Sequence, residues 1–269
     1  LDETLQTTLL PSGAPVTDTL IDVSDGVTVN AKNDGDLWAF SLAAGIAWPK
    51  KSENPAGETG PAEAHSGVGI SGDVSINTVG DDVNAYIRDG GKLQASSLSI
   101  KAENDTDLTA VAGAAALAKS TGQKTSVGLA GSLSKNVLSG ANGSDVADTR
   151  AFLAGPLGTG KLVVTTNNLE VKSDRKGSIL AGAIGGSGAI GGKLGIAVAG
   201  SVTDNVIRNR IESFVTSVDV DNIPGAALAS VAITSSDKSE IRSLAGSIAF
   251  SVASPSNGGS GATGQFAVG

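Results

Sequence analysis

The sequence contains no cysteine and no methionine, and only 3% of its residues are aromatic. Without cysteine, no disulfide can stabilise the fold and no thiolate can act as a nucleophile or zinc ligand. Because aromatic side chains contribute much of the buried area of an ordinary core, their scarcity disfavours that kind of core. Since methionine is missing even at position 1, we expect the chain to belong to a longer product.

Basic charge is also scarce. The chain has 19 Lys and Arg against 27 Asp and Glu, for a net charge of −8. Nucleic-acid binding needs clustered basic residues, and anionic membranes attract basic ones. The apolar run 178–192 is glycine-rich and shorter than the roughly 20 residues of a helical span. We therefore expect no nucleic-acid partner and no membrane insertion.

The chain does contain an internal repeat. Similar stretches open at Val27, Leu98, Leu169 and Val231, with spacings of 71, 71 and 62 residues. Each alternates apolar and polar residues, passes a polar turn and continues as a small-residue strand, as in 98–114. A fixed period is typical of stacked architectures, in which each unit buries its apolar face against the next.

Two more strand segments recur in each unit. Residues 68–77 resemble 127–136 and 194–205, and the strands 84–87, 150–153 and 210–215 follow them. Residues 266–269 resemble the start of a further copy. We therefore expect residues 1–22 to be a linker or the end of a preceding repeat and 23–269 to be one solenoid, with repeats at about 23–93, 94–164, 165–227 and a truncated 228–269.

The pattern predicts an all-β fold. A period of 71 divides into about three coils of roughly 24 residues, which matches a parallel β-helix with three short faces. Small residues alternate with Val, Ile and Leu, and glycine reaches 37 residues, as expected where two faces approach closely and outward positions meet water. An antiparallel β-sandwich of hairpins explains the same alternation and stays open.

Two glycine motifs suggest nucleotide binding but lack its context. Residues 155–161 match a phosphate-binding loop, but Leu162 stands where Ser or Thr should bind magnesium, and a strand pattern follows. The spacing GxGxxG occurs at Gly67, Gly186 and Gly259, and none of these opens a helix. We assign no cofactor site.

Acidic turns could supply oxygen ligands to calcium. They contain Asn33, Asp34 and Asp36; Asn104, Asp105 and Asp107; and Asp219, Asp221 and Asn222. The third repeat places Asp174-Arg-Lys-Gly at the equivalent position, so the ligand set is not maintained. We expect solvated turns and assign no metal site, and calcium binding stays open.

Catalytic candidates are few. His65 is the only histidine, and no GxSxG motif accompanies it. The adjacent acids Asp81 and Asp82 could serve a polysaccharide lyase or hydrolase. Such an enzyme would line a groove with aromatic residues, which occur here as Trp38, Phe40, Trp48 and Tyr86. We expect these to be core or ladder residues, predict no enzyme and assign no catalytic residue. Two solvent-facing tryptophans would favour the groove.

Insertions fall at one point of the repeat, at Pro49–His65 and again at 254–261, where the third unit has only 186–192. Variable loops at a fixed point lie on one side of a stack, often the binding side. Whether Pro49–His65 is a binding loop stays open.

The segments 66–77, 84–87 and 98–107 resemble the repeat regions of giant bacterial exoproteins, the filamentous haemagglutinin-like and leukotoxin-like adhesins. The resemblance covers Val27 to the end and implies a right-handed β-helix, secreted or on the cell surface, without cofactor. It implies a structural, adhesive stalk that contacts other repeats of its own polypeptide, cell-surface glycans or host proteins. A polysaccharide-binding or polysaccharide-cleaving β-helix is the alternative, and a subunit that self-associates laterally or end to end into filaments is another.

Overall fold

The computed structural model describes residues 20–50, 64–122, 124–141, 145–157, 161–225, 230–253 and 264–269. These residues form strands joined by short connections, and every pair of hydrogen-bonded strands among them is parallel. The all-β prediction is therefore confirmed. The alternative of antiparallel hairpins is wrong for the described residues.

The strands form four sheets, which we call A to D. Sheet A contains β1 (Leu20–Asn33), β5 (Gly91–Asn104), β9 (Leu162–Thr165), β10 (Asn168–Arg175), β14 (Val218–Asp221) and β15 (Ser230–Asp237). Sheet B contains β2 (Asp36–Ala47), β6 (Asp107–Lys119), β11 (Ser178–Gly191) and β16 (Glu240–Ala253). Sheet C contains β3 (Gly67–Gly80), β7 (Thr125–Ser139), β12 (Leu194–Ile207) and β17 (Gly264–Val268). Sheet D contains β4 (Val83–Arg88), β8 (Ala147–Ala154) and β13 (Asn209–Thr216).

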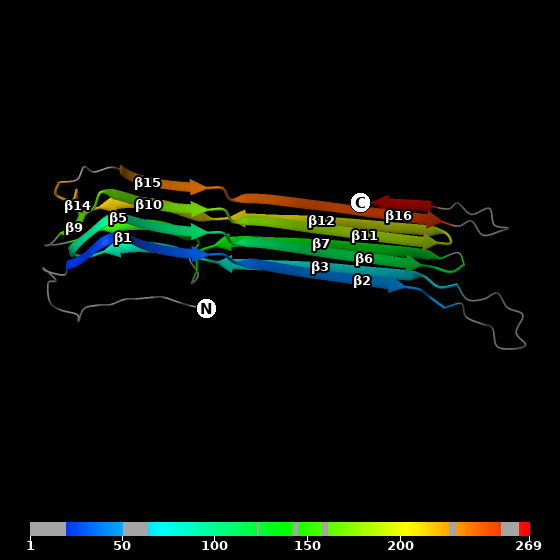
Figure 1. Cartoon of the computed structure of the whole chain (residues 1–269). Coiled ribbons are helices and arrows are strands. Elements are labelled where there is room, and N and C mark those ends of the chain that lie inside the picture. The colour runs from blue at the N-terminus through cyan, green and yellow to red at the C-terminus, as the bar shows by residue number, and fades with distance from the viewer. Residues whose placement is uncertain are drawn as a thin grey trace, which may run out of the picture.

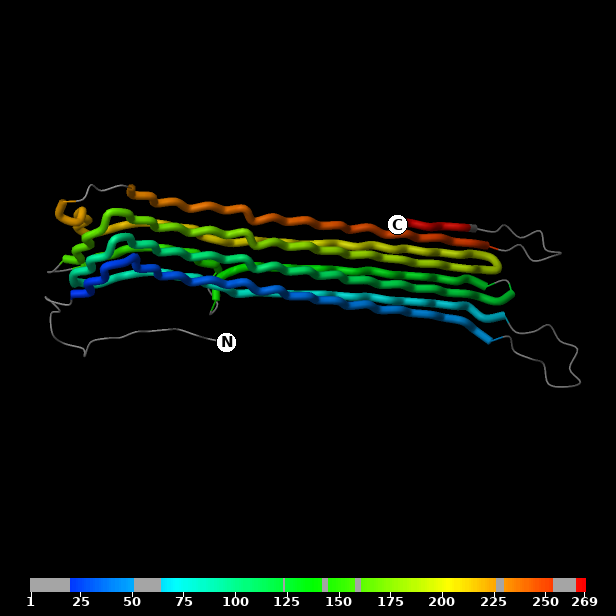
Figure 2. The backbone as a smooth tube through the Cα atoms, in the orientation of Figure 1, coloured from blue at the N-terminus to red at the C-terminus, as the bar shows by residue number. Residues whose placement is uncertain are grey.

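Each repeat crosses the four sheets in the order A, B, C, D. The strands of sheets A and B follow one another in the same direction, and those of sheets C and D return, so each repeat is a long, flat circuit (Figures 1 and 2). Sheet B packs against sheet C, and sheet A against sheet D. We call these two parts the B/C half and the A/D half.

One repeat makes one layer of the stack, so the prediction of about three coils per repeat is wrong. Leu98 pairs with Leu169, 71 residues further along, and Asp36 pairs with Asp107. The physical reason is strand length: most strands of sheets B and C have 12 to 15 residues, so one circuit uses the whole period. The polar turns merely separate sheet A from sheet B without reversing the chain (Figure 1).

The third step of the repeat is shorter than the others because the connections between strands are shorter, not the strands themselves. Leu169 pairs with Val231 and Ser178 with Glu240, 62 residues apart, without a register shift in either pair of strands. Most of the expected linker 1–22 lies outside the described residues, but Leu20 already belongs to β1 and pairs with Lys92.

The A/D half has an ordinary aliphatic core. Its buried side chains point between the two sheets and include Leu98, Ile100, Leu153, Val164 and Val171. The alternate residues of the same strands, such as Lys101 and Glu170, face outward and form an ion pair of 3.0 Å. Water therefore meets the polar side of sheet A, as predicted from the alternation.

The B/C half is packed differently, because its interior holds mainly Ala, Gly and Ser. A Cβ atom on Gly128 of sheet C would lie 2.4 Å from the carbonyl oxygen of Gly188 in sheet B. A Cβ on Gly185 would lie 2.7 Å from the oxygen of Gly200. The backbones of the two sheets thus approach too closely for larger inward side chains, which confirms the prediction of closely opposed faces.

Ladders of like residues run across the repeats. Asn77 Nδ2 donates to Asn136 Oδ1 at 2.8 Å, and Asn136 Nδ2 donates to Asn205 Oδ1 at 2.7 Å. On sheet D, the rings of Tyr86, Phe152 and Phe214 stack at centroid distances of 4.9 Å. These contacts fix the register, because a slip of one residue would move each side chain to the opposite face.

The close approach of sheets B and C predicts different costs for two alanine substitutions in β7. Gly128→Ala should lower the free energy of unfolding by about 1–3 kcal/mol, because the new methyl group overlaps the Gly188 carbonyl. Gly131→Ala should change it by less than about 1 kcal/mol, because the nearest atom lies 4.0 Å away. Urea unfolding of both variants tests this. Equal losses in the free energy of unfolding would contradict the close contact of sheets B and C at Gly128.

Candidate functional site

The first strand residues of sheet B form a polar row on its outer face. The pairing places Asp36 beside Asp107, Asp107 beside Ser178, and Ser178 beside Glu240. Two residues further along, the row reads Trp38, Thr109, Leu180 and Arg242. Parallel, in-register strands thus bring together four segments that are far apart in the sequence.

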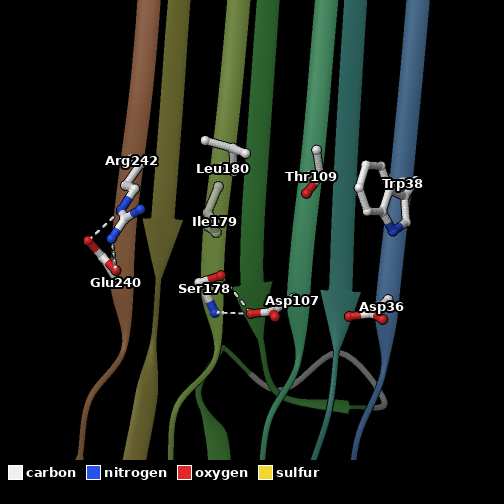
Figure 3. Close-up of a pocket in the computed structure, with 9 residues that line it drawn as sticks. All are labelled: Asp36, Trp38, Asp107, Thr109, Ser178, Ile179, Leu180, Glu240 and Arg242. Atoms are coloured by element: carbon white, nitrogen blue, oxygen red, sulfur yellow. Dashed lines mark hydrogen bonds and ion pairs between the residues drawn. The ribbon is translucent and has the colours of Figure 1, made fainter.

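These residues line a shallow depression of about 260 Å³ (Figure 3). Asp107 Oδ1 accepts hydrogen bonds from the Ser178 amide at 2.9 Å and from the Ser178 hydroxyl at 2.6 Å. Arg242 forms a two-point ion pair with Glu240, at 2.6 and 3.0 Å. Trp38 forms one wall, and the carboxylate of Asp36 has no partner among the described residues.

Both tryptophans face solvent, the observation that would favour an aromatic groove. Trp38 and Phe40 lie side by side with ring centroids 6.2 Å apart, and the Lys119 ammonium lies 4.4 Å from the centroid of Trp48. Tyr86 belongs to the stack on sheet D instead. The predicted core or ladder role thus holds for Tyr86 and is wrong for the other three.

The outer face of sheet B is apolar well beyond this depression. In and just after β2, the large outward side chains are 57–82% exposed; they are Trp38, Phe40, Leu42, Ile46 and Trp48. The outer face of β16 continues this surface with Leu244, Ile248, Phe250 and Val252. The outward positions of this sheet are exposed to solvent, as expected, but they carry large apolar residues, so the usual arrangement of apolar residues inside and polar residues outside is inverted.

Sheet C shows the same inversion on the opposite side of the B/C half. Its exposed residues include many large apolar ones, namely Val68, Ile70, Val74, Ile76, Val202, Phe266 and Val268. Polar groups lie between the sheets instead: Asp73 Oδ2 accepts hydrogen bonds from the Ser41 hydroxyl at 2.7 Å and the Gly113 amide at 2.8 Å. Regular alternation of large and small residues signals this surface, but alternation alone does not say which set faces out.

The sequence pair Asp81 and Asp82 does not form a dyad. Asp81 is buried at the junction of the two halves, whereas Asp82 is exposed and its Oδ1 accepts a hydrogen bond from the Asp148 amide at 2.8 Å. Adjacent residues in extended backbone point to opposite faces, which explains the separation.

Asp81 forms an ion pair with Arg175 inside the protein, where the two side chains are 6% and 0% exposed. Arg175 Nη1 lies 3.3 Å from Asp81 Oδ1, and the Thr106 hydroxyl donates to Asp81 Oδ2 at 2.6 Å. Asn33 Nδ2 in turn donates to the Thr106 hydroxyl at 2.9 Å. We call Asn33, Asn104, Thr106, Asp81 and Arg175 the junction cluster.

Asp237 continues the row of Asn33, Asn104 and Arg175 at the end of sheet A. Burial raises the pKa of the Asp237 carboxyl, but hydrogen bonds from Ser239 and Asn209 and the charge of Arg175 outweigh it and hold the pKa below its usual value. The Asp237 carboxyl is therefore ionised at neutral pH, and its charge interacts with that of Arg175.

The acidic turns do not converge on one point. Asp34 pairs with Lys32 at 2.8 Å, and Asp219 pairs with Lys161 at 2.8 Å. In the part of the chain that the structure describes, no three His, Asp or Glu residues are grouped as metal ligands would be.

Other sequence candidates lie at loops. His65 exchanges hydrogen bonds with Thr121, from its amide to the Thr121 hydroxyl at 3.0 Å and from the Thr121 amide to its carbonyl at 2.9 Å. Most of the insertion Pro49–His65 and residues 158–160 of the phosphate-loop pattern lie outside the described residues. Leu162 begins β9, so a strand follows that pattern, as predicted.

No known protein family matches this chain, and neither a curated protein nor a solved structure matches it significantly. The described residues include no helix that is long and apolar enough to cross a membrane.

Breaking the junction ion pair should be costly. Asp81→Leu leaves the Arg175 charge buried without its partner and should lower the free energy of unfolding by about 3–5 kcal/mol. Asp81→Leu combined with Arg175→Met replaces both charges and should recover most of that loss. Denaturant unfolding of the two single variants and the double variant tests this. If the loss in free energy of unfolding of the double variant equals the sum of the two single losses, a direct pairing is contradicted.

Proposed function

We propose that this chain is a structural, adhesive segment of a large bacterial cell-surface or secreted repeat protein, and that further repeats of a right-handed β-solenoid continue its sheets at both ends. The observation that carries the proposal is the solvent exposure of core positions in the last repeat. Core positions that are buried in the middle repeats are open in the last one: Val231, Ile233 and Ile241 are 44–50% exposed, whereas Leu98, Ile100 and Leu108 are at most 1% exposed. One more layer would bury them.

The side chains at the two ends also suit one another. The asparagine ladder ends at Asn205 and begins at Asn77, and the aromatic stack ends at Phe214 and begins at Tyr86. On sheet D, Arg210 stands at one end, paired with Asp148, and Asp82 stands in the same row at the other. A fourth strand on sheet D, placed like the existing three, would therefore extend the aromatic stack and lie beside Arg210, and a longer fourth strand on sheet C would extend the asparagine ladder.

In such a protein the layers supply length, and the connections between sheets B and C supply the contact sites. The strands β2, β6, β11 and β16 all end at the same end of the molecule (Figure 1), so the connections to sheet C all begin there. This supports the expectation that the loops occupy one side of the stack, where they would contact host proteins or surface glycans.

Cysteine cross-linking tests the end-to-end continuation, because the native chain has no cysteine. Phe40, Val111, Gly182 and Leu244 form one row, so Phe40 of a following copy would lie about 4.8 Å from Leu244, within disulfide range. Phe40→Cys with Leu244→Cys should give dimers and longer ladders under mild oxidation.

The matched control is Ala44→Cys with Leu244→Cys, in which the second cysteine lies four residues, or roughly 13 Å, off the row. A single cysteine variant can cross-link only through the same residue of a second copy, so it reports contacts between outer faces rather than end-to-end contacts. Equal cross-linking in all these variants, or none in the first, would contradict the proposal.

Binding of a neutral glycan is a second candidate, favoured by the exposure of Trp38 over the depression. The carboxylates of Asp36, Asp107 and Glu240 would repel acidic polysaccharides, whereas the Trp38 ring can stack on a sugar. We expect titration calorimetry to detect binding of neutral oligosaccharides to the native chain. Trp38→Ala should weaken this binding at least about fivefold, whereas Trp48→Ala should leave the affinity unchanged. Equal binding by both variants, or none by the native chain, would exclude this site.

A further inference from the structure

The B/C half exposes apolar side chains on two opposite faces. On sheet B, the outward residues between the rows of Trp38 and Trp48 are all uncharged; they are Phe40, Leu42, Ala44, Ile46, Val111, Gly113, Ala115, Leu117, Gly182, Ile184, Gly186, Gly188, Leu244, Gly246, Ile248 and Phe250. Sheet C presents Val68, Ile70 and Val74 on the other side. Apolar patches of this extent mark a contact surface.

The apolar band has a defined height. Ten residues separate Trp38 from Trp48, which at about 3.3 Å per residue is about 33 Å. The hydrocarbon core of a bilayer is about 30 Å thick, and tryptophan is enriched at both of its borders. Charged groups lie at the two ends of the band: Asp36, Glu240 and Arg242 beside Trp38, and Lys119 beside Trp48.

On sheet C, the outward-facing charges of the strands lie at the Trp38 border of this band. Lys135 and Asp204 form an ion pair of 3.7 Å in the row of Ile76. Asp73, three residues before Ile76, reaches Ser41 across the interior, which places this row near the Trp38 end of sheet B. The outward residues between Val68 and Val74 in β3 carry no charge.

We propose that the hydrocarbon of a lipid bilayer surrounds the B/C half, with its strands crossing the bilayer and the A/D half remaining in water. Hydrocarbon contacts both faces at once, and the height of the band between its two tryptophans is close to the thickness of a bilayer core. The interior suits this, because Asp73, Ser41 and Asn136 satisfy their hydrogen bonds between the sheets, away from lipid. The expectation of no membrane insertion considered helical spans and anionic lipid, neither of which this arrangement needs.

The proposal rests on the proposed function in one respect. The outer edges of β2, β3 and β16 expose backbone groups that lipid cannot satisfy, so neighbouring layers must pair with them. The cross-linking of Phe40→Cys with Leu244→Cys reports that pairing in water, independently of lipid. The two proposals can therefore fail separately.

Depth-dependent quenching of tryptophan tests the insertion, because Trp38 and Trp48 are the only tryptophans. The chain is reconstituted by detergent dilution into phosphatidylcholine vesicles whose acyl chains carry bromine at a shallow or a deep position. Trp48→Phe leaves Trp38 as the reporter, and Trp38→Phe leaves Trp48. A third reporter, Leu42→Trp in a chain with both substitutions, lies midway along the band.

We expect shallow bromine to quench Trp38 and Trp48 best and deep bromine to quench the Leu42→Trp reporter best. Shallow quenching at all three positions would indicate adsorption to the surface and overturn the proposal. No quenching, together with concentration-dependent sedimentation that Leu42→Asp abolishes, would show that the band binds a second copy, and would also overturn it. Cross-linking without quenching would leave the proposed function intact and exclude lipid.

A charge in the band supplies the matched control. Leu42→Asp should lower the fraction of protein that floats with vesicles by about tenfold or more, because it places a carboxylate in hydrocarbon. Thr28→Asp, on the exposed outer face of β1 in the same repeat, should float like the native chain. Circular dichroism of both variants in detergent reports folding, and equal flotation by folded variants would contradict insertion.

Discussion

The close approach of sheets B and C is the constraint on which the rest of this structure depends. Carbonyl oxygens of one sheet lie close to where Cβ atoms of the other would stand, as between Gly188 and Gly128, so at these positions the interior accepts no side chain larger than that of glycine without a shift of the backbone. Large residues in the same strands have only the outer faces available. The apolar surface is thus a direct consequence of a thin interior, whereas the wider A/D half keeps its aliphatic residues inside.

The change from one packing to the other happens within a few residues, between Asn33 and Asp36 and at the equivalent points of the other repeats. Side chains that face inward there lie between the aliphatic core of the A/D half and a small aliphatic cluster of Leu108, Leu138 and Ile179 at the start of the B/C half. The junction cluster occupies this position, and Arg175 is fully buried in it beside Asp81. Hydrogen bonds link Asp81, Thr106 and Asn33 in this cluster, but Arg175 Nε and Nη2 have no hydrogen-bond partner among the described residues. The buried guanidinium therefore depends strongly on its ion pair with Asp81.

Much of the fold could be predicted from the sequence, because the repeat is carried by local patterns. The segments around Leu98, Leu169 and Val231 are neighbours in one sheet, and the small-residue strands face one another as expected. The number of coils could not be predicted, because the turn at Asn104 looks the same whether the chain reverses or continues. Strand length, which decides the matter, depends on contacts between repeats.

The direction of the faces in sheet B was also beyond the sequence pattern. In β2, Trp38, Phe40 and Leu42 alternate with Ala39 and Ser41, and either set could be interior. The pattern favours the three large residues as the core, because burial of large side chains stabilises most proteins. Burial of the large side chains is not required where the sheet is surrounded by an apolar medium or covered by a neighbouring surface. The outward orientation of the large residues therefore depends on what surrounds the B/C half. The spacing of its two tryptophans corresponds to an apolar layer about 33 Å thick.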